Sequence, residues 1–173
     1  SLEAVCTILE LDRPLSEIYW LNVADPGFPF GGVIEHTNFI GPAEYGGRHL
    51  VYLSHYFEAK NRLARMTPQD IGEEMTQPLS RIFPDFKTTH LCNRSVFRTA
   101  TAATVCDLNF SQRVPECRTE LDNLFLATMA HVYPDERSCN NAIRVATEAC
   151  RVMDLETSMP PMGASLAGKL GMS

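Results

Sequence analysis

The hydrophobic pattern in the first third of the chain predicts β-strands separated by turns. Apolar runs rich in β-branched, aromatic and leucine side chains are typical of strands, and they occur at 5–11, 18–23, 33–40 and 50–54. Tyr45-Gly46-Gly47 is a turn signal before the last of them. In the third run, strand alternation places His36 and Asn38 on one face of the strand. Glu35 and Thr37 then point to the other face.

Two helices are predicted from capping residues and apolar spacing. The first begins after Thr67, which fits the N-cap, with Pro68 at the first helical position. Apolar residues follow at helical spacing, and Pro78 is expected to kink this helix or to end its first half. The second helix begins after Ser138, which can cap its start.

The remaining segments complete an α+β pattern. Residues 87–110 are rich in Thr, Val and Phe and predict one or two further strands. The run 124–127 is short and apolar and follows Asp122-Asn123, which is typical of a buried strand in an α/β unit. Beyond Asp154 the composition changes, and we expect residues 156–173 to form a linker-like tail.

Composition and charge narrow the possible partners. The chain has 173 residues, of which 45% are hydrophobic and 21% charged, as in an ordinary globular protein with room for one domain. Its formal net charge is -6. Because nucleic acids and anionic membrane surfaces attract basic proteins, we expect neither as a partner. No apolar run approaches the roughly 18–20 residues that cross a bilayer, so no membrane span is expected.

Several common chemical motifs are missing from the sequence. The six cysteines form no C-x-x-C pair, and no H-E-x-x-H is present, so no metal site is expected. No leader segment is recognisable at the start, which favours free thiols and a cytoplasmic location. No G-x-G-x-x-G occurs either, and this is the usual phosphate-binding element of a dinucleotide domain.

The polar residues at 35–38 are the main candidates for a binding surface. One interpretation is a cleft wall that offers polar groups to a ligand. The other is a strand face in contact with water, which half-exposed strands commonly present. Tyr19 and Trp20 also have two interpretations: their rings pack in a core, or they stack on a flat ligand.

An ordered set of segments carries a family resemblance over residues 3–155. The segments are Ile18-Tyr19-Trp20-Leu21-Asn22-Val23-Ala24-Asp25, Pro29-Phe30-Gly31-Gly32-Val33-Ile34-Glu35-His36-Thr37-Asn38-Phe39, Tyr45-Gly46-Gly47-Arg48-His49-Leu50-Val51-Tyr52-Leu53-Ser54, Phe83-Pro84-Asp85-Phe86, Asn123-Leu124-Phe125-Leu126-Ala127, Tyr133-Pro134-Asp135-Glu136-Arg137 and Asn140-Asn141-Ala142. Taken together, they resemble the C-terminal part of the FAD-dependent amine oxidase and protoporphyrinogen oxidase-like superfamily. The branch that they resemble is related to UDP-galactopyranose mutase.

The resemblance implies an α+β fold in which residues 3–118 form a substrate-binding domain with a mixed β-sheet flanked by helices. Residues 119–155 would be the returning strand and helix of an FAD-binding α/β domain, whose N-terminal region this sequence does not contain. The implied cofactor is FAD. The implied partners are a small-molecule substrate and the missing FAD-binding region.

The resemblance also implies site residues. The start of the last helix, at Asn140, Asn141 and Ala142, would face the flavin pyrimidine edge, because helix N-termini carry free N–H groups and partial positive charge. Met129 and Ala130 would lie near the ribityl and pyrophosphate groups. The residues expected to bind substrate are Tyr19, His36, Asn38 and Tyr52.

Three functions remain open from the sequence. The first is the substrate-binding part of an amine oxidase-like oxidoreductase, which we expect to be inactive as an isolated chain. The second is a flavin-dependent sugar-nucleotide mutase-like isomerase, which would need arginines for a diphosphate, such as Arg48, Arg94 and Arg98. The third is a non-enzymatic binding or assembly module. It gains support from Ala127 and Thr128, where the family has Gly followed by an acidic residue. A lone returning strand and helix would expose apolar surface, so we expect self-association or docking of the helix on the chain's own sheet.

Overall fold

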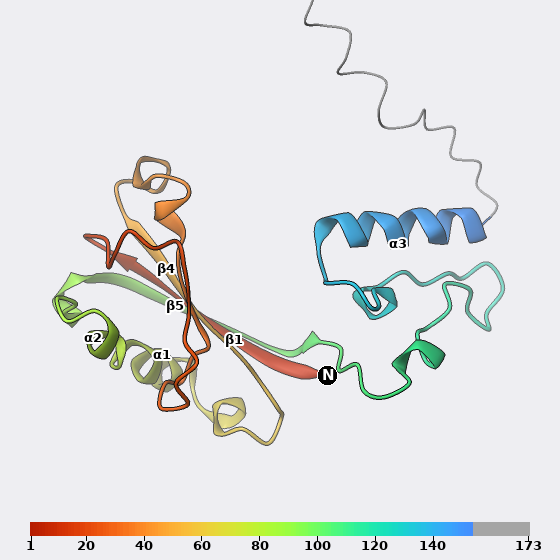
Figure 1. Ribbon diagram of the computed structural model, residues 1–173, viewed down its shortest axis with the longest axis horizontal. Coiled ribbons are helices and arrows are strands. Elements are labelled where there is room, and N and C mark those ends of the chain that lie inside the picture. Colours follow the sequence, from red (N-terminus) through yellow and green to blue (C-terminus); the bar gives the residue numbers. More distant parts are fainter. Residues whose placement is uncertain (154–173) are drawn as a thin grey trace, which may run out of the picture. The chain divides into compact units, whose positions relative to one another are not determined.

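The computed structural model describes residues 1–153 and confirms the α+β class predicted from the sequence (Figure 1). Contacts divide the chain into two compact units, and the first ends at Val105. The predicted tail at 156–173 lies outside the described residues. The division at residue 118 into a substrate domain and a returning FAD-binding segment stays a prediction.

The first unit is built on a five-stranded sheet with the strand order β2-β3-β4-β1-β5. The strands are β1 (Leu2–Leu11), β2 (Trp20–Asn22), β3 (Gly32–Glu35), β4 (His49–Phe57) and β5 (Leu91–Ala103). Every pairing in this sheet is antiparallel, whereas the resemblance implied a mixed sheet. For β2–β3 and β3–β4 the reason is that each pair follows in sequence without an α-helix that could carry a parallel crossover.

Helices α1 (Pro68–Thr76) and α2 (Leu79–Ile82) lie along one face of the sheet (Figure 1). The Thr67 hydroxyl accepts a hydrogen bond of 3.2 Å from the Asp70 amide, which confirms the predicted cap. Pro78 separates the two helices, as predicted, because its ring nitrogen has no proton to continue the hydrogen bonding of α1.

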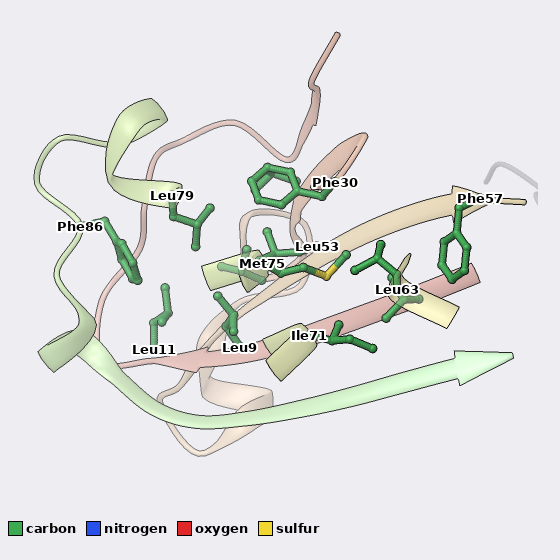
Figure 2. Packing of buried hydrophobic residues seen from close by; sticks show 13 residues of the cluster. Leu9, Leu11, Phe30, Leu53, Phe57, Leu63, Ile71, Met75, Leu79 and Phe86 are labelled. Atoms are coloured by element: carbon green, nitrogen blue, oxygen red, sulfur yellow. The ribbon is translucent and has the colours of Figure 1, made fainter. Parts of the chain in front are cut away.

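A hydrophobic core fills the space between the sheet and these helices. Figure 2 shows Leu9 and Leu53 of the sheet packed with side chains of α1 and α2. The helix residues that contribute most are Ile71, Met75 and Leu79, and all five side chains are buried. Burial of each such side chain stabilises the fold by about 1.5–3 kcal/mol. The core therefore fixes which face of the sheet points toward the helices.

The strand predicted at 33–40 is shorter than expected. β3 ends at Glu35, and the 3₁₀ turn η1 (His36–Asn38) follows it. The neighbouring strand β2 has only three residues, and its pairing with β3 ends where the Glu35 amide donates to the Tyr19 carbonyl at 2.8 Å. Without a strand partner, the Phe39 amide donates to the His36 carbonyl and closes a turn. The segment 87–110 contains a single strand, β5, which follows the 3₁₀ turn η4 (Thr88–His90).

The second unit contains the helix α3 (Cys139–Val152) and the 3₁₀ turns η5 (Phe110–Gln112) and η6 (Met129–His131). The buried strand predicted at 124–127 is wrong. Phe125 makes an isolated bridge to Arg118, and Leu124 and Leu126 are about half exposed. A buried strand needs neighbours on both sides, and residues 106–153 supply only this bridge. Within residues 1–153, no helix has the length and hydropathy needed to cross a membrane.

Candidate functional site

The face of the sheet opposite α1 and α2 carries apolar side chains that no α-helix of residues 1–105 covers. Cross-strand partners share a face, so the strand register sets which side chains lie there. Trp20, Ile34, Tyr52 and Ile8 form one row across four strands, and Cys6 and Phe97 belong to the next row. Trp20 is 54% exposed and Phe97 59%. These six residues are termed the open face.

Polar groups gather beside the open face at Tyr52. Nε2 of His36, in the turn after β3, shares a hydrogen bond of 2.6 Å with the Tyr45 hydroxyl. The His36 ring also lies edge-on to the Tyr52 ring, with 5.7 Å between the ring centroids. His36, Tyr45 and Tyr52 are termed the His-Tyr cluster. An imidazole and two phenols can donate and accept hydrogen bonds and can hold a proton at a polar atom of a ligand.

The 3₁₀ turn η2 (Pro42–Tyr45) brings Tyr45 into this cluster. The chain leaves η2 through Gly46 and Gly47, whose φ angles are 63° and 79°. Residues with a Cβ rarely adopt these angles, so the glycine pair lets the chain reverse direction into β4. In the sequence Tyr45 belongs only to a turn signal, and its spacing gives no indication that it contacts His36.

Glu35 and Asn38 hold the loop before β2 from two sides. Glu35 is only 1% exposed, and its carboxylate accepts hydrogen bonds from the amides of Leu15 (2.7 Å) and Ser16 (3.0 Å) and from the Ser16 hydroxyl (3.0 Å). The Asn38 side chain donates to the carbonyls of Ser16 (2.9 Å) and Ile18 (3.1 Å). The two residues therefore fix the backbone that leads into β2 and to the open face.

The structure brings together two of the four residues predicted to bind substrate. His36 and Tyr52 meet in the His-Tyr cluster, whereas the amide of Asn38 is used on backbone carbonyls. Tyr19 lies beside the open face, with its ring centroid 6.3 Å from that of Trp20 and 5.4 Å from that of Phe39. The geometry thus favours His36, Tyr45 and Tyr52 for ligand contact, and Asn38 for positioning.

The arginines considered for a diphosphate are occupied elsewhere. Arg98 donates to the carbonyls of Leu63 (3.0 Å) and Ala64 (2.9 Å). Arg94, also on β5, reaches α1 with its side chain, and its guanidinium lies 3.8 Å from the Glu73 carboxylate. By register, both side chains lie on the face of the sheet that the helices cover. Arg48 donates to the Cys92 sulfur at 2.8 Å. None of the three belongs to the open face.

The titratable groups of the open face are held in their neutral forms. Burial raises the pKa of the Tyr52 phenol above its ordinary value, and the neighbouring Tyr45 and Cys6 add to this shift. Burial also raises the pKa of the Cys6 thiol. Both groups are uncharged near neutral pH, because desolvation disfavours the charged form of an acid.

We expect the free energy of unfolding to fall at high pH, and to fall less in Tyr52→Phe. Above the ordinary phenol pKa of about 10, the unfolded chain loses the Tyr52 proton while the folded chain keeps it, so the folded state loses stability as the pH rises. Urea unfolding on both sides of this pH measures the effect. Cys6→Ala separates the contribution of the thiol. An identical pH dependence in wild type and Tyr52→Phe would contradict the shift.

In the second unit, the residues predicted to face a flavin occupy two short segments. Met129 and Ala130 lie in η6, and the first turn of α3 contains Asn140, Asn141 and Ala142. The Ser138 hydroxyl accepts from the Asn141 amide at 3.3 Å, which confirms the predicted cap. The backbone amides of Cys139 and Asn140 have no partner among the described residues, as is usual in a first helical turn. The helix therefore presents two free N–H groups at its start.

Metal ligands do not gather in the described part of the chain. Within residues 1–153, no group of three or more His, Cys, Asp or Glu side chains could hold a metal ion. All six cysteines are free thiols.

The fold is similar to that of an oxidoreductase from Methanosarcina mazei, with a TM-score of 0.56 and 19% sequence identity. The match covers 88% of this chain and 34% of that protein, so this chain spans about a third of its length. At this identity the likeness shows the fold alone. No protein-family model matches the chain, and no curated protein matches it.

Proposed function

We propose that the chain supplies the substrate-binding sheet of an FAD-dependent, amine oxidase-like oxidoreductase, together with the helix end that faces the flavin. The open face is the observation that carries this proposal. It joins rows of apolar and aromatic side chains, among which the register also places Ser54 and Ser95 but no arginine or lysine, to a cluster of three hydrogen-bonding rings. Exposed apolar surfaces of this kind mark sites of ligand or partner binding. The similar fold of the Methanosarcina mazei oxidoreductase supports the same class of activity.

The second unit offers FAD a helix N-terminus. The free amides of Cys139 and Asn140, with the positive end of the α3 dipole, suit the flavin pyrimidine edge, which gains negative charge on reduction. The segment before η6 fits the cofactor less well. Thr128 replaces the acidic residue of the family, and its hydroxyl accepts from the Ala130 amide at 3.3 Å. The proposal for FAD therefore rests on α3.

When bound, FAD would supply the hydride acceptor. The residues of this chain would bind and orient the substrate. Ile8 and Ile34, which flank Tyr52 on the open face, would contact an apolar part of it and exclude water, and the His-Tyr cluster would hydrogen-bond its polar atom and hold a proton there. The sugar-nucleotide isomerase has less support, because the side chains of Arg94 and Arg98 lie on the helix-covered face of the sheet and are bonded to groups there.

Cys139→Pro tests the role proposed for α3. Proline is favoured at the first helical position, so the variant removes one N–H donor and keeps the helix. We expect the protein expressed from the gene that encodes this chain to retain flavin, and Cys139→Pro to bind FAD about tenfold more weakly, the effect of one lost hydrogen bond. Titration followed by flavin fluorescence measures the affinity.

Cys139→Ala is the matched control, because it removes the thiol and keeps the backbone amide. It should bind FAD as tightly as wild type. A protein that retains no flavin would overturn the proposal. Equal affinities of Cys139→Pro and Cys139→Ala would overturn the assignment of the helix end.

A further inference from the structure

The second unit contains a cavity of about 480 Å³ that the proposed function does not use. Its volume lies within the range of about 300–1,000 Å³ that is usual for small-molecule sites. Val145 and Val152 of α3 form an apolar wall, and Val114 and Pro115 form another. None of the five residues predicted to face FAD lines this cavity.

His131 contributes a polar group without a partner. The residue is 9% exposed and lines the cavity, and its Nε2 is buried and has no hydrogen-bond partner among the described residues. A buried polar nitrogen in a folded protein normally has one. The unpaired atom therefore points to a hydrogen-bond partner outside the described residues.

The contacts of Nδ1, the other ring nitrogen of His131, indicate which of the two nitrogens carries the proton. The Thr128 amide lies 3.1 Å from Nδ1 of His131 and donates to no other group in the described residues. The Thr128 carbonyl is also 3.1 Å from Nδ1, but it already accepts from the His131 backbone amide at 3.0 Å. Nδ1 therefore accepts the hydrogen bond of the Thr128 amide and carries no proton. In the neutral imidazole the proton then lies on Nε2, which makes this atom a donor.

The charges around the cavity offset one another. Arg118 and Arg144 line it together with Glu116 and Glu148, which gives two guanidinium groups and two carboxylates. Arg144 is also paired with Asp135 at 3.0 Å. The lining therefore offers no excess positive charge to hold an anion, and the ligand that it suits is neutral.

We infer that this cavity binds a small neutral molecule whose carbonyl oxygen accepts a hydrogen bond from Nε2 of His131. The apolar body of the ligand packs against Val114, Val145 and Val152. The ligand class follows from three features: an apolar wall, one unpaired donor, and balanced charge.

Benzamide, toluene and benzoate test this inference on the 173-residue chain, because they share one ring and differ in the attached group. Nitrogen–proton correlation spectra of the histidine rings report the His131 tautomer and its response to each compound. We expect benzamide to shift Nε2 of His131 and to bind about tenfold more tightly than toluene, the effect of one hydrogen bond. Benzoate should bind no more tightly than benzamide.

Two substitutions separate the ligand contact from the contact with Thr128. His131→Asn keeps an acceptor for the Thr128 amide and removes the distal donor, and it should abolish the preference for benzamide over toluene. His131→Gln carries an N–H group at the distal position and should retain the preference. Binding of none of the three compounds, equal affinities for benzamide and toluene, or an unchanged preference in His131→Asn would each overturn the inference. These outcomes do not depend on flavin, which is tested at Cys139.

Discussion

Replacing Glu35 with alanine is expected to lower the free energy of unfolding by about 3 kcal/mol, because several hydrogen-bond donors lose their acceptor at once. The carboxylate accepts from the amides of Leu15 and Ser16 and from the Ser16 hydroxyl, and it is only 1% exposed. Glu35→Gln keeps one oxygen and should cost less, about 1–2 kcal/mol. Urea unfolding measures both values. Hydrogen exchange at Leu15 and Ser16 should accelerate in both variants.

Glu10→Gln is the control for this experiment. Glu10 also stands on a strand of the sheet and accepts a hydrogen bond, from the Asn93 side chain at 2.8 Å, but this pair is exposed. The change should shift stability by less than about 0.5 kcal/mol. If Glu35→Ala were as mild as Glu10→Gln, the Glu35 carboxylate would not hold the loop, and the placement of Trp20 would need another cause.

Leu53→Ala and Phe97→Ala should differ strongly in stability, because they lie on opposite faces of one sheet. Leu53 is fully buried under the helices (Figure 2), so its truncation is expected to cost about 3 kcal/mol. Phe97 is 59% exposed on the open face, and its truncation should cost less than about 1 kcal/mol. Denaturant titration of the two variants at several protein concentrations measures the difference.

A large cost for Phe97→Ala would contradict an open face in solution. If that cost grew with protein concentration, a second copy of the chain would cover the face, in line with the self-association expected from the sequence. A small cost at every concentration would leave the face free for a ligand. The comparison therefore tests the surface on which the proposed function depends.

Short-range sequence patterns were sufficient to predict the helix caps and most strands. Thr67 and Ser138 cap their helices as predicted, and Pro78 divides α1 from α2. These features depend on residues a few positions apart, where backbone hydrogen bonding and side-chain type decide the outcome. The apolar runs likewise correspond to strands, because a run of β-branched and aromatic residues favours extended backbone wherever a partner strand is available.

The errors occur where a partner strand was assumed. The run at 124–127 has the composition of a buried strand, yet residues 106–153 give it one isolated bridge. The run at 33–40 stops at Glu35, because β2 is too short to pair with the rest of it. The composition of a segment indicates a preference for strand, but a strand forms only where neighbouring strands satisfy its backbone hydrogen bonds.

The candidate site was only partly accessible from the sequence. His36 and Tyr52 could be chosen from their chemistry, but the short separation between Nε2 of His36 and the Tyr45 hydroxyl depends on how the 3₁₀ turns η1 and η2 fold the chain between them. Glu35 stood beside His36 in a polar patch that could have faced water. In the structure its carboxylate is buried and bonded to a loop about twenty residues earlier, which no local pattern indicates.

The amino-acid sequence by itself determined the α+β class, the helix caps and the positions of most strands, because these depend on neighbouring residues. Only the tertiary structure decided which face of the sheet is open, which side chains share it, and that His131 keeps an unpaired nitrogen beside a cavity. Those features depend on the register of strands and on contacts between residues far apart in the chain. Such pairings are selected by packing and hydrogen bonding of the whole fold, for which no short segment carries enough information.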